Sequence, residues 1–76
     1  MIKDYEDLKK VGNRIKGYRL IKGFTENEMA VAIGKSVKTY CNYENGKTEI
    51  RLSNIVSLSH KLGCSCDELG WGGIRK

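Results

Sequence analysis

The sequence predicts a single small all-α domain over residues 1–76, with a core over 8–69 and a short tail over 70–76. Three observations favour this fold class. Apolar residues recur at spacings of three and four, whereas the two-residue alternation typical of strands is weak. The chain contains no proline. Glycines follow the periodic segments, at positions where they end helices. A chain of this length buries only a modest core, so its stability is marginal.

The first periodic segment predicts a helix that begins near Asp4, a suitable N-cap, and stops at Gly23. Gly12 and Gly17 lie inside it, and each weakens a helix by roughly 1 kcal/mol relative to alanine. We therefore expect one of them to permit a close contact with another helix. The inward stripe follows positions i, i+3, i+7 and i+10, which are Leu8, Val11, Ile15 and Tyr18.

Two short amphipathic segments between residues 25 and 46 predict a helix-turn-helix. Thr25 is the expected N-cap of the first, with Glu28 as its capping-box partner. Gly34 ends it because glycine enters a left-handed turn without steric cost. Ser36 is the expected N-cap of the second helix, and Asn45-Gly46 ends it. The inward positions of the two helices are Met29, Ala30, Ile33, Tyr40 and Tyr43, and the outward face of the second is Val37, Lys38, Cys41 and Asn42.

The remaining segment predicts a fourth helix, which begins near Leu52 or is capped by Ser53, and a last short helix over 66–69 capped by Ser65. The glycine-rich tail is too flexible for a stable helix. Trp71 and Ile74 in that tail are large and apolar, so they pack either on their own domain or against a partner subunit. The inward stripe of the fourth helix is Leu52, Ile55, Leu58 and Leu62.

Composition limits the class of protein. Fourteen basic residues against nine acidic ones give a net charge of +5, which suits a polyanionic partner but also fits an ordinary solvated surface. No apolar run approaches the roughly 18 residues that a membrane span needs. The charged start of the chain does not resemble a signal peptide, so a cytoplasmic location is expected. The three cysteines are an odd number and would stay reduced there.

The span from about Val11 to Leu69 resembles a helix-turn-helix domain of the Cro and phage-repressor type, the Xre-like family of bacterial and phage transcription regulators. The resemblance covers most of the chain, in register and without gaps. It implies a compact five-helix, lambda-repressor-like fold. The matching positions are Gly12, Arg14, Ile15, Arg19, Thr25, Glu28, Met29, Ala30, Gly34, Ser36, the run from Tyr43 to Lys47, Leu52, Ile55, Leu58, Leu62-Gly63 and Asp67-Glu68-Leu69.

The resemblance also implies a function: a sequence-specific, double-stranded-DNA-binding regulator. It would act as a repressor, as a homodimer on an inverted repeat, and associate with the nucleoid when bound. The helix over about 36–45 would enter the major groove. The residues that this implies as base contacts are Ser36, Val37, Lys38 and Asn42. Those implied as phosphate contacts are Thr25, Glu26, Lys35, Lys47 and Thr48.

Two further roles follow from the resemblance. Arg19 and Glu44 would form a structural ion pair that ties the first helix to the end of the recognition helix. Leu69, Trp71 and Ile74 would be candidates for a two-fold dimer interface.

The chain departs from the family pattern at three places. Glu26 replaces a common glutamine that contacts phosphate, and its carboxylate would repel phosphate unless Lys35 or Lys38 offsets it. Ile50-Arg51 replaces a proline followed by a helix cap, and Val31 leaves an apolar residue facing outward. Glu26 and Val31 together keep a second reading open, in which the scaffold is a protein-interaction module, such as an antitoxin-like partner, with weak or no DNA binding.

Other functional classes have little support in the sequence. His60, Cys41 and the Cys64-x-Cys66 pair do not match the spacing of a common metal site, so buried apolar thiols are expected at 64 and 66. A redox-sensing role for Cys41 has no further sequence support. No nucleophile, phosphate-binding glycine loop or carboxylate pair has usable spacing. We therefore expect no enzyme, no metal, no cofactor, no membrane association and no small-molecule ligand.

Overall fold

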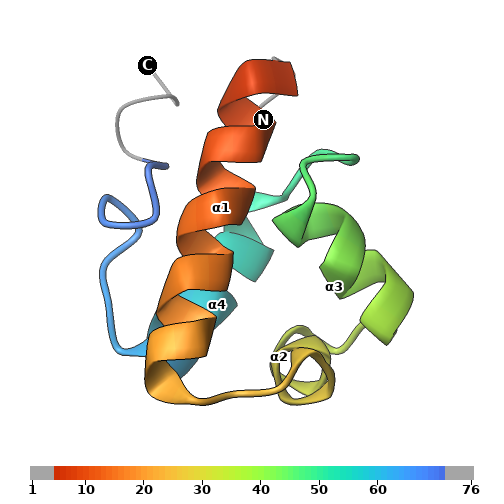
Figure 1. Cartoon of the computed structure of the whole chain (residues 1–76), viewed down its shortest axis with the longest axis vertical. Coiled ribbons are helices and arrows are strands. Elements are labelled where there is room, and N and C mark those ends of the chain that lie inside the picture. Colours follow the sequence, from red (N-terminus) through yellow and green to blue (C-terminus); the bar gives the residue numbers. More distant parts are fainter. Residues whose placement is uncertain (1–4, 72–76) are drawn as a thin grey trace.

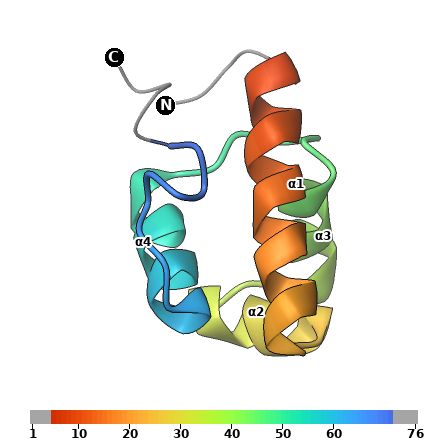
Figure 2. The ribbon, with the colours of Figure 1, turned by 60° about the vertical axis from the view of Figure 1, so that its left-hand side comes forward.

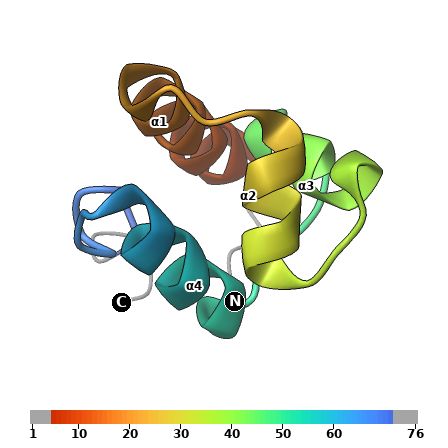
Figure 3. The same cartoon turned by 90° about the horizontal axis from the view of Figure 1, so that it is seen from below.

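The computed structural model describes residues 5–71, which form four helices and no strand. The helices are α1 (Tyr5–Lys22), α2 (Glu26–Ile33), α3 (Val37–Glu44) and α4 (Leu52–Leu62). Figure 1 shows α1 along the long axis, with α2 and α3 to one side and α4 behind it. The helices close a ring in which α1 packs on α3, α3 on α2, α2 on α4 and α4 on α1 (Figure 3). This ring encloses one apolar core.

The core contains the inward stripes expected from helical spacing. Leu8, Val11 and Ile15 are buried in α1, and Tyr18 packs against the core from the same helix. In α4, Leu52 is exposed although it was expected to face inward, while the other three members of that stripe are buried. The buried apolar set is Leu8, Val11, Ile15, Met29, Ala30, Ile33, Tyr40, Tyr43, Ile50, Ile55, Leu58, Leu62, Leu69 and Trp71.

Glycine sets the distance between α1 and the end of α3. A Cβ atom at Gly12 would collide with the backbone carbonyl oxygens of Tyr43 and Glu44. Gly46 adopts a φ of 69° and lies against the backbone of Lys9, where a Cβ atom would come within 2.8 Å of the Lys9 nitrogen. Gly12 is therefore the glycine that permits the expected close contact. Gly17, in contrast, has open space where its Cβ would lie.

Local capping determines where the helix-turn-helix bends. The Thr25 hydroxyl accepts a hydrogen bond from the Glu28 amide at 3.1 Å, and the Thr25 amide donates to the Glu28 carboxylate at 2.8 Å. This is the expected capping box. Gly34 ends α2 with a φ of 65°, and the Ser36 hydroxyl caps α3 by accepting from the Thr39 amide at 3.2 Å. Both caps were predicted from the sequence.

The start of α4 lacks a side-chain cap. Its N-cap is Arg51, which makes no capping hydrogen bond, and Ser53 lies inside the helix. The helix thus begins at Leu52, which was one of the two predicted starts. The other prediction, that Ser53 is the N-cap, is wrong. Ile50, in place of the family's proline, is fully buried in the core. Its burial anchors the loop before α4 through apolar contact rather than through a rigid backbone.

The described chain has no fifth helix, which corrects the expected five-helix fold. Residues 66–70 form turns instead, with hydrogen bonds from the Leu69 amide to the Cys66 carbonyl and from the Gly70 amide to the Asp67 carbonyl. Ser65 and Glu68 still make the reciprocal bonds of a capping box. A helix cannot propagate from one turn when Gly70 follows at once, because nucleation is costly and glycine opposes extension.

The C-terminal turns return along α1 and close the core (Figure 2). The Arg14 guanidinium donates to the Glu68 carbonyl at 3.3 Å, and the Tyr18 hydroxyl donates to the Glu68 carboxylate at the same distance. Leu69 is fully buried and Trp71 is 3% exposed in this single chain. Two of the three dimer candidates, Leu69 and Trp71, are therefore buried in the core of their own chain. For Trp71 this is the first of the two alternatives that the sequence offered. Asp4 and Ile74 lie outside the described residues.

Candidate nucleic-acid interface

The outward side of α3 is the surface that the sequence singled out. Tyr40 and Tyr43 turn inward and are buried, whereas Val37 and Lys38 are exposed and Asn42 is partly exposed. Ser36 is exposed at the entrance of the helix, with its hydroxyl used as the N-cap. The four side chains proposed to contact bases thus lie at the N-terminus of α3 or on its outer side. This short helix lies at the edge of the molecule (Figure 1).

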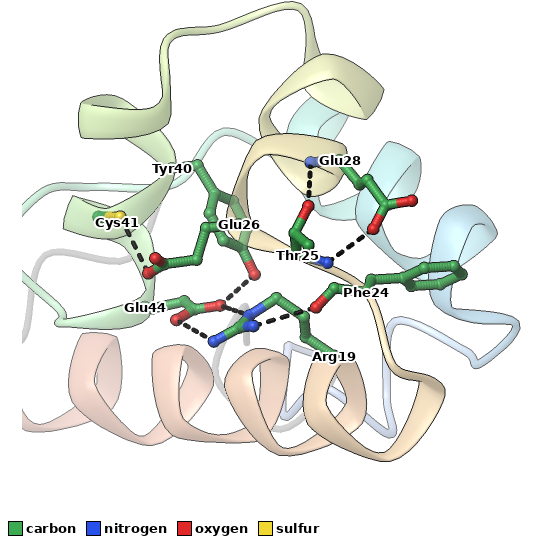
Figure 4. A network of polar contacts seen from close by, with 8 residues as sticks. All are labelled: Arg19, Phe24, Thr25, Glu26, Glu28, Tyr40, Cys41 and Glu44. Atoms are coloured by element: carbon green, nitrogen blue, oxygen red, sulfur yellow. Dashed lines mark hydrogen bonds and ion pairs between the residues drawn. The ribbon is translucent and has the colours of Figure 1, made fainter.

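A buried ion pair fixes α3 against α1. The Nε atom of Arg19 donates to Oε2 of Glu44 at 2.6 Å, and Nη2 donates to Oε1 at 3.4 Å. Nη1 of Arg19 also donates to the Phe24 carbonyl at 3.1 Å (Figure 4). The expected pair is therefore present, and it also holds the loop that enters α2. The hydrogen bond to Glu44 raises the pKa of the Arg19 guanidinium, so the guanidinium remains charged.

Two tyrosines of α3 make further buried hydrogen bonds, one of them to the ion pair. The Tyr40 hydroxyl donates to Oε2 of Glu44 (Figure 4). Burial, followed by this hydrogen bond, raises the pKa of Tyr40, so its phenol stays protonated. The Asn54 amide donates to the Tyr43 hydroxyl at 2.9 Å and connects α4 to α3. α3 is thus held from α1 and α4, and neither tyrosine contact was predicted.

Glu26 contacts a thiol rather than a lysine. The Cys41 Sγ donates to the Glu26 carboxylate at 3.1 Å, which joins the first turn of α2 to the outer side of α3 (Figure 4). This hydrogen bond raises the pKa of the Cys41 thiol. Among residues 5–71 no ion pair joins Glu26 to Lys35 or Lys38. Sequence reasoning missed this contact, although both residues were placed near the DNA-facing side.

The residues expected to contact phosphate surround α3. Lys35 is exposed just before the helix, and Lys47 is exposed just after it. Thr48 is half-buried in the following loop. The Lys47 amide already donates to the Asn42 carbonyl at 2.9 Å, so this backbone group closes the helix end. Thr25 is exposed at the start of α2, but its hydroxyl and amide are both used by the capping box.

The charges around α3 favour an anionic partner, with one local exception. Lys35, Lys38 and Lys47 are exposed, while the carboxylate of Glu44 is buried against Arg19. Glu26 is the exposed carboxylate in contact with α3. A phosphate near the start of α2 would meet a favourable helix dipole and an unfavourable Glu26 charge.

The cysteines and the histidine are dispersed. No cluster of three or more potential metal-ligating side chains occurs among residues 5–71. Cys64 and Cys66 are half-buried and pack against the core, and burial raises the pKa of Cys64. No helix between residues 5 and 71 has the length and apolar character required to span a bilayer.

This geometry defines a helix-turn-helix domain whose second helix presents polar side chains to solvent. A family model described as helix-turn-helix matches residues 15–69. The chain belongs to this helix-turn-helix family, of the Xre and Cro type.

Relatives of known name agree with this membership. The chain is 40% identical over 58 residues to YonR of Bacillus subtilis, an SPbeta prophage-derived uncharacterized HTH-type transcriptional regulator. That match covers 76% of this chain and 54% of YonR, so the chain spans about half the length of this relative.

Two crystal structures share the fold. The restriction-modification controller protein C.AhdI from Aeromonas hydrophila matches with a TM-score of 0.79 and 30% identity, over 84% of this chain and 97% of the controller. The clp gene regulator ClgR from C. glutamicum matches with a TM-score of 0.77 and 27% identity, over 83% of this chain and 82% of ClgR.

Proposed function

We propose that this chain is a sequence-specific, double-stranded-DNA-binding transcriptional regulator that acts with α3 in the major groove. The observation that carries the proposal is the arrangement of α3. Its outer side bears the exposed Lys38 and the partly exposed Asn42, and it contacts α2 through the Cys41–Glu26 hydrogen bond, while Arg19 and Glu44 hold its inner side. Similarity to named regulators and a controller protein supports the same function.

Direct readout would come from the first turns of α3. The Lys38 ammonium can donate to O6 and N7 of a guanine, and the Asn42 amide can pair with N6 and N7 of an adenine. Val37 can contact a thymine methyl group, and Ser36 lies at the entrance for a phosphate or a base. Each good base contact contributes roughly 1–3 kcal/mol of discrimination.

Phosphate contacts would set the register of the helix in the groove. Lys35 and Lys47 stand at the two ends of α3, so they can bind phosphates on either side of the base contacts. Thr48 and the start of α2 at Thr25 would add further contacts. Glu26 would weaken this second site, because its carboxylate lies where a phosphate approaches.

The proposal includes a homodimer on an inverted repeat and repression by occupancy of the operator. An eight-residue recognition helix reads few base pairs, and two copies on a two-fold axis read two half-sites about one helical turn apart. A protein bound over an operator excludes other proteins from it. The regulator would act in the cytoplasm, on the nucleoid, without catalytic activity, metal or cofactor.

Glu26 favours a second candidate, a protein-interaction module of the antitoxin type with little DNA affinity. Selection from a random duplex pool at two salt concentrations separates the candidates. The regulator predicts enrichment of a two-fold symmetric site and binding that weakens steeply with salt, because phosphate contacts release counterions. Absence of enrichment, together with no retardation at low salt, would favour the second candidate.

A further inference from the structure

Two consecutive large aliphatic residues near the end of α1 have exposed side chains. Ile21 is 81% exposed and Leu20 is 59% exposed, while the apolar stripe of the same helix is buried on the opposite side. Singly exposed apolar residues are normal on a protein surface. Two adjacent ones form a small apolar spot, whose meaning depends on what surrounds it.

A bare stretch of backbone lies one turn before this spot. Gly17 precedes Leu20 and Ile21 by three and four residues, so each of the two is a neighbour of Gly17 on the helix surface. A Cβ atom at Gly17 would meet nothing within 4 Å, and its backbone is helical without a positive φ. Glycine lowers helix stability relative to alanine, and at this position the fold gains nothing in return. Unlike Gly12, Gly17 therefore serves no contact within the described chain.

The same side of α1 is basic. Between Leu8 and Lys22 the sequence has no acidic residue. Lys10 and Arg14 share the side of Gly17 and Ile21 at spacings of seven and three residues from the glycine, and both are exposed. Glu68 lies at the edge, where it contacts Arg14 through its carbonyl and Tyr18 through its carboxylate. We call Lys10, Arg14, Gly17, Leu20 and Ile21 the outer face of α1.

We propose that the outer face of α1 is a docking surface for an acidic protein segment that carries aliphatic side chains. The lysine and arginine would attract its carboxylates, Leu20 and Ile21 would bury its aliphatic groups, and Gly17 would let its backbone approach closely. The apolar groups that a duplex offers are the thymine methyls within the major groove, and its outer surface is phosphate and sugar, so Leu20 and Ile21 favour a protein partner. An interfacial membrane helix needs a broad apolar face, whereas the broad face of α1 is already buried in the core.

This surface is separate from the proposed DNA contacts. The residues of α1 that touch α3 include Gly12, which lies against the Tyr43 and Glu44 carbonyls, and Arg19, which pairs with Glu44. The outer face lies on the other side of α1, so a partner could bind there while α3 occupies DNA. The inference stands independently of DNA binding.

The test uses the full chain labelled with nitrogen-15 and a synthetic helical peptide with glutamate along its length and leucine on one side. NMR titration should give saturable shifts at the amides of Lys10, Gly17 and Ile21, without shifts in α3. Gly17→Ala should raise the Tm of the chain yet weaken peptide binding at least fivefold, because the new methyl group holds the peptide backbone away. Ile21→Ser should weaken binding similarly. Val31→Ser is the matched control: it removes a comparably exposed aliphatic group from α2 and should leave binding unchanged.

Four results would overturn the proposal. These are the absence of saturable shifts, unchanged peptide affinity in Gly17→Ala, equal binding by a peptide with lysine in place of glutamate, and the same shifts with anionic phosphatidylglycerol vesicles. Self-association of the free chain that is lost in Ile21→Ser would instead make this face a contact between two copies. DNA binding measured on the same variants should not change, which separates this test from that of the regulator.

Discussion

The ion pair between Arg19 and Glu44 gives the sharpest prediction about how α3 is held. Replacing one partner leaves the other charge buried, since Arg19 is 8% exposed and Glu44 is 5% exposed. Arg19→Met also removes the donor to the Phe24 carbonyl. Breaking a buried pair from one side typically costs about 3–5 kcal/mol. We expect about 3 kcal/mol for Arg19→Met, because the Tyr40 hydroxyl still donates to the remaining carboxylate.

The double variant should be more stable than the two single losses predict. Once Arg19→Met is present, Glu44→Leu removes an uncompensated carboxylate and adds apolar surface. We therefore expect Glu44→Leu to cost at least about 1–2 kcal/mol less in the Arg19→Met background than alone, a coupling within the usual range for contacting residues. A domain of this size has a total stability of about 4–11 kcal/mol at typical values per residue, so the single variants should remain measurable.

Urea unfolding followed by fluorescence measures this cycle directly. Trp71 is the single tryptophan and is 3% exposed, so its emission should change when the core opens. Circular dichroism gives an independent helix signal. Strictly additive losses would refute the reasoning, because they would mean that Arg19 and Glu44 stabilise the fold independently.

Three further predictions follow from the same structure. Glu26→Gln should tighten DNA binding about two- to fivefold, or about 0.5–1 kcal/mol, by removing a like charge near the phosphate site; Asp67→Asn, on the exposed C-terminal turns, is the control and should change affinity less. Gly12→Ala should destabilise the fold by about 3 kcal/mol or more, because the new Cβ collides with the Tyr43 and Glu44 carbonyls. Gly17→Ala should instead stabilise the fold by up to about 1 kcal/mol. Equal effects of the two substitutions in thermal unfolding would contradict the packing described. Glu26 raises the pKa of Cys41, so less thiolate is present at a given pH. In a Cys64→Ser, Cys66→Ser background, Glu26→Gln should therefore accelerate alkylation of Cys41 by iodoacetamide at pH 8. An unchanged rate would mean that the hydrogen bond does not form in solution.

The helix-turn-helix could be predicted from the sequence because its signals are local. Each cap bonds to backbone groups only three or four residues away, and the caps form as expected. They are the capping box of Thr25 and Glu28, the C-cap at Gly34 and the N-cap at Ser36. The pairing of Arg19 with Glu44 spans 25 residues and has no local signal. It was expected only because of the resemblance to the family.

Two of the errors lie in the C-terminal segment, over residues 65–71. Ser65 and Glu68 carry the sequence signature of a helix start and form its hydrogen bonds, yet Gly70 stops the helix after one turn. The glycine-rich tail made Trp71 look available to a partner, but Trp71 is buried in the core of its own chain. Only the three-dimensional arrangement shows that the core has room for it.

The candidate site was predicted as a set of positions rather than as a set of contacts. Periodicity placed Val37, Lys38 and Asn42 on the outer side of α3, and the structure has them exposed or partly exposed there. Periodicity could not show that Glu26 bonds to Cys41, because this contact depends on how α2 and α3 pack against each other and not on the spacing within either helix. The Cys41 thiol is neutral, so this contact leaves the Glu26 charge at the proposed phosphate site without an offsetting cation.

Fluorescence anisotropy on a selected operator tests the central claim most directly, with the wild-type chain, Asn42→Ala and Lys47→Ala compared at several salt concentrations. We predict that Asn42→Ala loses about 1–3 kcal/mol of discrimination at one base pair, while Lys47→Ala weakens all duplexes equally and lowers the salt slope by about one. If both variants bind like the wild-type chain, or if salt leaves the affinity unchanged, α3 is not the element that reads DNA.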